Sequence, residues 1–326
     1  MSQPTPPILI ATRGSALALA QANFVLASCR KKFPSLAFDL KIIKTTGDKI
    51  QTASPEEAAA LATRALFTKE LEVALLQREA DLAVHSLKDL PVDLPAGLKL
   101  AAVAGEREDV RDVLIYRLDD NLKPKMKLAD LPAGLTVATG SARRRTQLLA
   151  LRPDFKIVEI LGNVPTRLQK LAAQPEINAT LLAAAGLSRL HILRTPTGLL
   201  KGKGIPDGLC ALLLEPAQML PCVGQGAIGL EIRDQDGPTA EICRHLDHFE
   251  TFQCVTAERS FLRAMGGGCQ TPIGAHASIA GGQIHLRAVA HLTQDVQRAE
   301  GKRPLSEAEE LGVQVATQLK SSGPTA

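Results

Sequence analysis

The sequence predicts an α/β fold, built from two related α/β domains and a small α+β domain at the C-terminus. Short apolar runs alternate with amphipathic segments along most of the chain. Strands that alternate with helical segments of about 10–15 residues are typical of mixed, mainly parallel sheets. The chain of 326 residues is also too long for one ordinary domain, since domains usually hold roughly 100–200 residues.

The elements of the first α/β domain follow one another in the order that such a fold requires. An apolar strand (8–13) leads through Gly14 and Ser15 into a helix, and the next segments are an alternating strand (38–45), an amphipathic helix (66–80) and an apolar strand (81–86). The pattern restarts after about residue 105, with strands at 135–140, 156–163 and 179–186 and helices between them.

Two segments indicate a weak internal duplication. ATRGSALALAQ (11–21) and ATGSARRRTQL (138–148) each read as a strand that ends in Ala-Thr, followed by Gly-Ser and a helix. The repeat suggests two similar α/β domains that face each other. We expect domain 1 to comprise residues 1–105 and 217–237, domain 2 residues 106–216, and domain 3 residues 238–326. Domain 3 should contain a helical stretch (240–265), two strands around Gly281-Gly282 and a helix (305–320).

Composition excludes several classes of protein. Hydrophobic residues make up 45% of the chain and charged residues 22%, as in soluble globular proteins. There is no Trp and one Tyr, and the net charge is only +4, which argues against a nucleic-acid platform built on stacked aromatic residues. No apolar run reaches the ~20 residues of a membrane span. No secretory signal, CxxC pair or HExxH motif is present, so we expect a cytosolic protein with reduced thiols and no metal.

Arginines recur at the ends of the predicted strands, where helix N-termini attract anions. Arginine also binds carboxylates and phosphates through two parallel hydrogen bonds. Several such residues at corresponding positions predict a cleft for a small ligand with several carboxylates or phosphates. The candidates are Arg13, Ser15, Ser141, Arg143, Arg144, Arg145, Arg167 and Arg189. Any one of them alone would more often be a solvated surface residue.

Two further residues are candidates for chemistry. Asp89, in DLAVHSLKDLP, follows a strand beside Lys88, and a carboxylate among cations stays ionised and can stabilise positive charge or transfer protons. Taken alone, Asp89 is equally consistent with a turn or a helix cap. Cys269 follows three glycines, so a bulky group can approach its thiol. His85 reads as a structural residue rather than a general base.

Taken together, the motifs resemble those of the porphobilinogen deaminases, also called hydroxymethylbilane synthases. The similarity runs in order from about residue 8 to residue 320, and DLAVHSLKDLP and GGGCQTPIGA are its most specific segments. The other segments that carry it are ATRGSALALAQ, TTGDK, LFTKELEVALL, GEREDVRDV, GNVPTRLQKL, AAAGLSRL, VGQGAIGLE and TAERSFLRAM.

This resemblance implies a fold, a reaction and a cofactor. The first two domains would be similar to type 2 periplasmic binding proteins, and the third would carry a dipyrromethane cofactor, joined by a thioether to Cys269. The enzyme would be a monomeric cytoplasmic transferase of tetrapyrrole and haem biosynthesis, with no nucleic-acid or membrane partner. It would condense four porphobilinogen molecules head to tail with loss of ammonia, and release linear hydroxymethylbilane by hydrolysis.

The resemblance also implies residue roles. Asp89 would be the catalytic carboxylate that hydrogen-bonds pyrrole N–H groups and stabilises the cationic intermediate. Residues 46–66 would form a lid, and the lid residues of the site would be Arg64, Phe67 and Lys69. The carboxylates of cofactor and substrate would be bound by Arg13, Ser15, Lys88, Ser141, Arg143, Arg144, Arg167 and Arg189.

Some positions depart from the family pattern. Leu161 stands where an arginine usually precedes Gly-Asn, and Thr63-Arg64-Ala65 replaces a Gly-Lys-Gly run in the lid. Arg145 is one alternative source of the missing charge. We therefore expect an active but slow enzyme. Two alternatives remain: a cytosolic anion-binding protein, in which Cys269 has no role, and a degenerate paralogue with impaired elongation.

Overall fold

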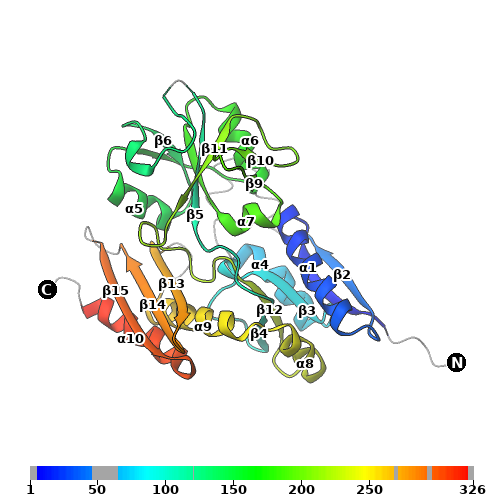
Figure 1. Ribbon diagram of the computed structural model, residues 1–326. Helices are drawn as coiled ribbons and strands as arrows, with labels where there is room; N and C mark the ends of the chain where they lie inside the picture. The colour runs from blue at the N-terminus through cyan, green and yellow to red at the C-terminus, as the bar shows by residue number, and fades with distance from the viewer. Residues whose placement is uncertain (1–5, 46–64, 120, 268–270, 292–295, 322–326) are drawn as a thin grey trace. The chain divides into compact units, whose positions relative to one another are not determined.

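A computed structural model describes residues 6–45, 65–119, 121–267, 271–291 and 296–321 (Figure 1). The chain divides into two compact units, each made of two stretches. Unit 1 comprises Met1–Arg107 and Ala227–Thr256, and unit 2 comprises Glu108–Gly226 and Ala257–Ala326. The chain leaves unit 1 after Arg107 and returns to it at Ala227. The finer division into three domains stays a prediction.

Unit 1 contains a five-stranded mixed sheet in the order β2-β1-β3-β12-β4. β1 is parallel to β2 and β3, whereas β12 is antiparallel to β3 and β4. The strands are β1 (Ile8–Arg13), β2 (Phe38–Ile43), β3 (Leu82–Ser86), β4 (Leu98–Val103) and β12 (Ile228–Arg233). The helices are α1 (Ala16–Lys32), α4 (Ala65–Leu76), α8 (Gly237–Leu246) and the short 3₁₀ helix η1 (Leu87–Asp89).

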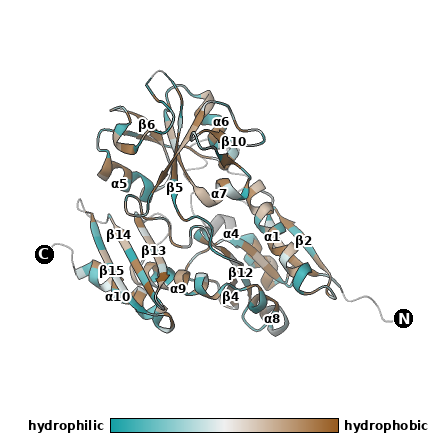
Figure 2. Ribbon diagram, in the orientation of Figure 1, coloured by the Kyte–Doolittle hydropathy of each residue, from teal (hydrophilic) through white to brown (hydrophobic). Residues whose placement is uncertain are grey.

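Helices cover both faces of the unit 1 sheet, which explains why most residues of its strands are apolar. Ile10 packs with Val25 of α1 and Ile242 of α8. Its neighbour Ala11 packs with Leu71 of α4 in a separate cluster, as expected for successive residues that point to opposite faces of a strand. Hydrophilic and hydrophobic residues are interleaved along α1 (Figure 2), the pattern of a helix with one face on a sheet.

Unit 2 contains a second five-stranded sheet, in the order β7-β6-β8-β5-β11. β6 is parallel to β7 and β8, whereas β5 is antiparallel to β8 and β11. The elements are β5 (Asp112–Arg117), η2 (Leu128–Asp130), β6 (Thr136–Ala138), α5 (Ala142–Leu151), β7 (Lys156–Val158), α6 (Val164–Ala173), β8 (Ala179–Ala183), α7 (Ala184–Arg189), the hairpin β9 (Leu193–Arg194) and β10 (Leu200–Lys201), and β11 (Leu209–Leu214).

The two sheets share one topology. In each sheet the first three positions are occupied by parallel strands, β2-β1-β3 in unit 1 and β7-β6-β8 in unit 2. An antiparallel strand inserted from a distant part of the chain comes next, and β4 or β11 forms the edge. The inserted strand is β12 in unit 1 and β5 in unit 2, and both follow a crossing between the units. This repeat confirms the predicted fold class, two α/β domains with mixed, mainly parallel sheets. It extends the duplication beyond the strand–helix turn.

The C-terminal part of unit 2 is a small α+β structure. A three-stranded antiparallel sheet is formed by β13 (Ile273–Ala280), β14 (Gln283–Ala290) and β15 (Gln297–Pro304). β13 and β14 are joined by Gly281 and Gly282, whose φ angles of 57° and 74° suit the left-handed turn of a tight hairpin. The chain ends with η3 (Leu305–Glu307) and α10 (Ala308–Ser321), which packs on β14 and β15 (Figure 1).

Two sequence-based expectations about this region were incomplete. The helical stretch 240–265 is two helices, because α8 ends at Leu246 and α9 (Phe249–Ala264) begins after a break. A third strand, β15, was missed, because its sequence QRAEGKRP is polar and no residue in it is fully buried. In the part of the chain that the structure describes, no helix is long and apolar enough to cross a bilayer.

Candidate active site

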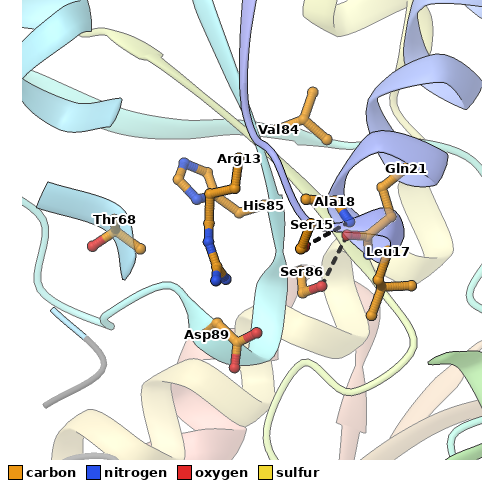
Figure 3. Close-up of a pocket in the computed structure, with 10 residues that line it drawn as sticks. All are labelled: Arg13, Ser15, Leu17, Ala18, Gln21, Thr68, Val84, His85, Ser86 and Asp89. Carbon is orange, nitrogen blue, oxygen red and sulfur yellow. Dashed lines mark hydrogen bonds between the residues drawn. The ribbon is translucent and has the colours of Figure 1, made fainter. Parts of the chain in front are cut away.

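A pocket in unit 1 lies at the carboxyl ends of neighbouring parallel strands (Figure 3). Arg13 is the last residue of β1, and Asp89 ends η1, directly after β3. Ser15, Thr68 and Ser86 add polar groups to the wall. This edge of a sheet is where α/β proteins usually bind ligands. The structure thus brings together three residues that the sequence nominated, Arg13, Ser15 and Asp89.

The N-terminus of α1 is fixed at this pocket by two side chains. Ser15 caps the helix, and its hydroxyl accepts a hydrogen bond from the Ala18 N–H at 3.3 Å. Ser86, at the end of β3, donates to Oε1 of Gln21 at 2.9 Å and so ties the helix to the strand (Figure 3). The partial positive charge of the helix N-terminus is therefore held beside the arginine.

The pocket presents charges of both signs. Arg13 and Asp89 are both half-buried, and Figure 3 shows the Arg13 guanidinium pointing toward the Asp89 side chain. Lys88 is half-buried and is not among the residues that line the pocket. A guanidinium suits an anionic group, while a carboxylate accepts N–H hydrogen bonds and stabilises positive charge. The arrangement can bind a ligand that carries carboxylates beside an N–H group or a developing cation.

His85 also lines the pocket and is a buried residue with a partner. Its Nε2 lies 2.9 Å from Oε2 of Glu231, which is completely buried on β12. Glu72 of α4 is buried as well, and burial, reinforced by the nearby Glu231 charge, raises its pKa although a Thr68 contact opposes this. Sequence analysis missed both glutamates. A charged residue inside the apolar run AIGLEIR was the signal for Glu231.

In unit 2 the corresponding turn is built in the same way. Ser141 caps α5, and its hydroxyl accepts from the Arg144 N–H at 3.4 Å. Arg143 and Arg144 are buried, with 5% and 6% of their surface exposed, and Arg145 is exposed. The duplication predicted from sequence therefore includes the serine cap, but the arginines here lie deeper than Arg13.

Both buried arginines bind Asp112, at the start of β5. Arg143 Nη1 donates to Oδ2 at 2.6 Å, and Arg144 Nη2 donates to Oδ1 at 2.8 Å. Burial alone would raise the pKa of Asp112, but the two guanidinium charges lower it far below its usual range. Carbonyl oxygens accept the other bonds, Leu220 from Arg143 and Leu181 from Arg144. Asp112 was not predicted from the sequence.

The remaining unit 2 arginines contact backbone. Arg167 Nε donates to the Gly162 carbonyl at 2.8 Å, and Arg189 Nη2 donates to the Gly226 carbonyl at 2.6 Å. Both side chains are half-buried. Burial lowers the pKa of Arg189, an effect that the charge of Glu108 opposes.

Some predicted site residues fall outside the part that the structure describes. Cys269 and Arg64 lie outside the described residues, and so does the Phe67 side chain. Lys69 is exposed on α4. The lid and the attachment cysteine stay predictions. Within the described ranges all cysteines are free thiols, and no cluster of three potential ligands could hold a metal ion.

The fold and the pocket define a class: an α/β protein with two mixed sheets of one topology and a charged pocket at the strand ends. Residues 8–241 match the family described as porphobilinogen deaminase, dipyromethane cofactor binding domain, and residues 252–321 match porphobilinogen deaminase, C-terminal domain. The chain belongs to the porphobilinogen deaminase family. It therefore has the function of this family, that of a transferase of porphyrin biosynthesis, hydroxymethylbilane synthase.

Individual relatives match over almost the whole chain. The porphobilinogen deaminase of Chloroherpeton thalassium is 42% identical over 323 residues, which cover 97% of this chain and 95% of that protein. The porphobilinogen deaminase of Thermus thermophilus is 43% identical over 320 residues, 97% of this chain and 96% of that protein. Among solved structures, the VFT2 domain of BvgS from Bordetella pertussis aligns with 74% of this chain and 86% of that chain, at 17% identity and a TM-score of 0.42.

The residues of the pocket fit the dipyrromethane cofactor that the family carries. Its carboxylate side chains require cationic or hydroxyl partners, which Arg13 and Ser15 provide on the wall. Its pyrrole N–H groups require an acceptor, which Asp89 provides on the same wall. When bound, the cofactor supplies the primer to which substrate units are added.

Proposed function

We propose that this chain is an active enzyme that condenses four porphobilinogen molecules head to tail, with Asp89 as its catalytic carboxylate. The observation that carries this proposal is the position of Asp89 on one pocket wall with Arg13. A substrate that carries an acetate, a propionate, a pyrrole N–H and an ammonium group needs both charges at once. A binding protein for simple anions would gain nothing from a carboxylate in its pocket, because like charges repel.

The role of Asp89 follows from the charge that develops during the reaction. When ammonia leaves the aminomethyl group of porphobilinogen, the ring carries positive charge that is shared with its N–H. A carboxylate that accepts this N–H hydrogen bond lowers the energy of the cation, and such electrostatic stabilisation is commonly a large catalytic contribution. Half-burial of Asp89 strengthens the interaction relative to water.

We propose that the other predicted residues hold the carboxylates of substrate and cofactor. Arg13, Ser15 and Lys88 would act in unit 1, and Ser141, Arg143, Arg144, Arg167 and Arg189 in unit 2. Arg143 and Arg144 use part of their N–H groups on Asp112. A guanidinium has five N–H donors, so those of Arg143 Nε and Nη2 remain for a ligand. The Asp112 ion pairs would keep both groups in place before a ligand binds.

Cys269 is the proposed attachment point of the cofactor, and the protein is proposed to work as a cytoplasmic monomer. Intact mass spectrometry of the denatured protein tests the attachment. We expect a covalent excess equal to two porphobilinogen units less two molecules of ammonia, and we expect Cys269→Ser to lose it. An unmodified mass that persists after incubation with porphobilinogen or the product bilane would leave only the binding-protein or degenerate-paralogue alternatives.

Replacing Asp89 tests the catalytic proposal directly. We expect Asp89→Asn to lower turnover of porphobilinogen by about 10²-fold or more, with an unchanged melting temperature and cofactor mass. Asp93→Asn is the matched control, because Asp93 lies four residues along the same segment but is exposed and outside the pocket. Full activity of Asp89→Asn would remove this residue from its proposed role.

A further inference from the structure

A buried group of ionisable side chains lies behind the wall of the unit 1 pocket. His85 on β3 is 5% exposed, Glu231 on β12 is 0% exposed, and Glu72 on α4 is 8% exposed. The His85 Nε2–Glu231 Oε2 distance is 2.9 Å. Burying two carboxylates and an imidazole costs free energy that a purely apolar contact would not. A group that is retained at such a cost, and at a ligand pocket, is a candidate for function.

The register of the sheet explains how the pair forms. β3 and β12 are antiparallel, with Gly229 opposite His85 and Glu231 opposite Ala83. Glu231 is therefore the diagonal neighbour of His85 on the same face, within reach of a long side chain. Gly229 has no side chain, and a Cβ there would lie 2.8 Å from Leu87. The strand pairing thus places the carboxylate against one nitrogen of the ring and no other.

Apolar side chains enclose this group on one side, and the pocket lies on the other. Leu71 and Leu75 of α4 and Ala83 of β3 form the apolar cluster on this face of the sheet. The second oxygen of Glu231, Oε1, has no hydrogen-bond partner among the residues that the structure describes. The His85 ring, in contrast, lines the pocket together with Arg13 and Asp89 (Figure 3). His85 therefore lies between the buried carboxylates and the pocket.

We propose that His85 is the base that removes the proton displaced when each new carbon–carbon bond forms, and that Glu231 is its positioning residue. Nε2–H donates to Glu231, which leaves the lone pair of Nδ1 for the pocket. The C–H bond at the free α-carbon of the attacked pyrrole breaks, its electron pair returns to the ring, and an N–H bond forms at Nδ1. The imidazolium, stabilised by Glu231, then gives this proton to the ammonia released in the same condensation, which becomes ammonium.

This assignment separates two tasks that one carboxylate performs poorly together. Asp89 has to stay ionised to stabilise the cation, whereas a proton acceptor has to become neutral or positive in each cycle. Imidazole has a pKa near neutrality, where a base is most effective. The charged groups near His85 are Glu231 from β12 and Glu72 from α4, and Arg13 from β1 and Asp89 from η1 line the same pocket.

The inference rests on the proposed function, so the unmodified protein is assayed first. His85→Gln keeps an N–H donor near the position of Nε2 but cannot accept a proton. We expect its turnover to fall about 10²-fold or more. With porphobilinogen deuterated at its free α-carbon, the kinetic isotope effect should be larger in His85→Gln than in the unmodified protein, because proton removal becomes rate-limiting.

A second variant gives a readout that does not depend on turnover. In the cofactor-free Cys269→Ser background, long-range ¹H–¹⁵N NMR correlations report which nitrogen of the His85 ring carries the proton. Glu231→Gln keeps the shape of the partner but removes the carboxylate that accepts from Nε2–H, so the ring should no longer be held in this tautomer. In the active protein, Glu231→Gln should lower turnover and raise the kinetic isotope effect, as His85→Gln does. If His85→Gln fails to fold, the measurements on Glu231→Gln test the role of His85 instead.

His285→Gln is the matched control, because His285 also pairs with a glutamate, at 3.1 Å, but on the exposed side of β14. It should leave the isotope effect unchanged. An inactive unmodified protein would contradict the proposed function itself. An active protein in which His85→Gln retains full rate, or loses rate with an unchanged isotope effect, would overturn only the role of His85 and reduce the pair to a structural contact.

Discussion

Arg144 donates two hydrogen bonds to the same oxygen of Asp112, from Nε at 3.1 Å and from Nη2 at 2.8 Å. Asp112 is completely buried, and Gln225 Nε2 also donates to Oδ1, at 3.1 Å. Three segments of unit 2 therefore meet at one carboxylate: the start of β5, the first turn of α5 and the segment that leads out of the unit. The carboxylate holds α5, and hence the Ser141 cap, against the sheet.

Removing the Asp112 charge should destabilise unit 2 strongly. Asp112→Asn leaves two buried guanidinium groups without their counterion, and breaking a buried ion pair on one side costs about 3–5 kcal/mol. Urea or guanidinium denaturation, followed by far-UV circular dichroism, measures this loss. Asp39→Asn is the control, because its pair with Arg30 is exposed and long, at 3.5 Å, and it should leave the midpoint almost unchanged. Equal midpoints for the two variants would contradict the assigned role of Asp112.

The same carboxylate predicts an acid limit of stability. The pKa of Asp112 is lower in the folded protein than the value of about 3.9 expected in the unfolded chain. Its contribution to the free energy of unfolding is therefore fully present above about pH 4 and is lost as pH falls toward the folded pKa. Denaturation measured between about pH 5 and about pH 2.5 covers this range. The free energy of unfolding should fall more steeply with decreasing pH in the unmodified protein than in Asp112→Asn. Parallel curves would contradict the prediction.

Local chemistry explains how much of the fold and site the sequence predicted. The two strand–helix turns with the sequence Ala-Thr followed by Gly-Ser could be predicted because a serine cap is a local interaction. Ser15 and Ser141 each accept a hydrogen bond from an N–H three residues ahead. Arg13 and Asp89 were readable because parallel strands end at one edge. The inserted strands β5 and β12 were not assigned to a sheet position, because their partners lie far away along the chain.

The buried ion partners were missed for the same reason. The Arg143–Asp112 pair spans 31 residues and the His85–Glu231 pair spans 146, so no local spacing joins them. From the sequence alone, Arg143 and Arg144 look like exposed cations equivalent to Arg13. The structure shows them buried, because the carboxylate of Asp112 on β5 offsets their desolvation. Only the packing of helices and strands in three dimensions reveals which buried charged residues have partners.

Two cysteines of unit 1 should resist thiol reagents. Burial raises the pKa of Cys29 to about 11 and that of Cys243 to about 12. The thiolate is the reactive form, and at pH 8 only about one such thiol in a thousand or fewer is ionised, so alkylation should be correspondingly slow. Labelling with iodoacetamide and peptide mass spectrometry should find both unmodified in the native protein and modified after unfolding. Cys222, which is partly exposed, is the internal control. Native labelling of Cys29 at the rate of Cys222 would contradict this prediction.

A close helix contact in the C-terminal part of unit 2 should not tolerate a side chain. A Cβ on Gly312 of α10 would lie 2.5 Å from the Ala257 carbonyl oxygen and 2.6 Å from the Phe261 nitrogen, both backbone atoms of α9. Gly312→Ala must push the helices apart and should lower the free energy of unfolding by about 1–3 kcal/mol. Gly237→Ala, where a Cβ meets nothing within 4 Å, should be neutral or slightly stabilising. Equal melting temperatures would show that the helices separate freely.

Leu161 is the position where a new charge should improve the enzyme. Its side chain is 39% exposed, and its carbonyl accepts from Lys170 Nζ at 3.0 Å, one turn from Arg167 on α6. A charge-assisted hydrogen bond contributes about 1.5–3 kcal/mol, so Leu161→Arg should raise kcat/KM for porphobilinogen by about tenfold or more. Val158→Arg, at a similarly exposed position on β7, should not. An unchanged rate in Leu161→Arg would mean that a nearby cation already binds the carboxylate, and removing Lys170 or Arg145 would then lower the rate.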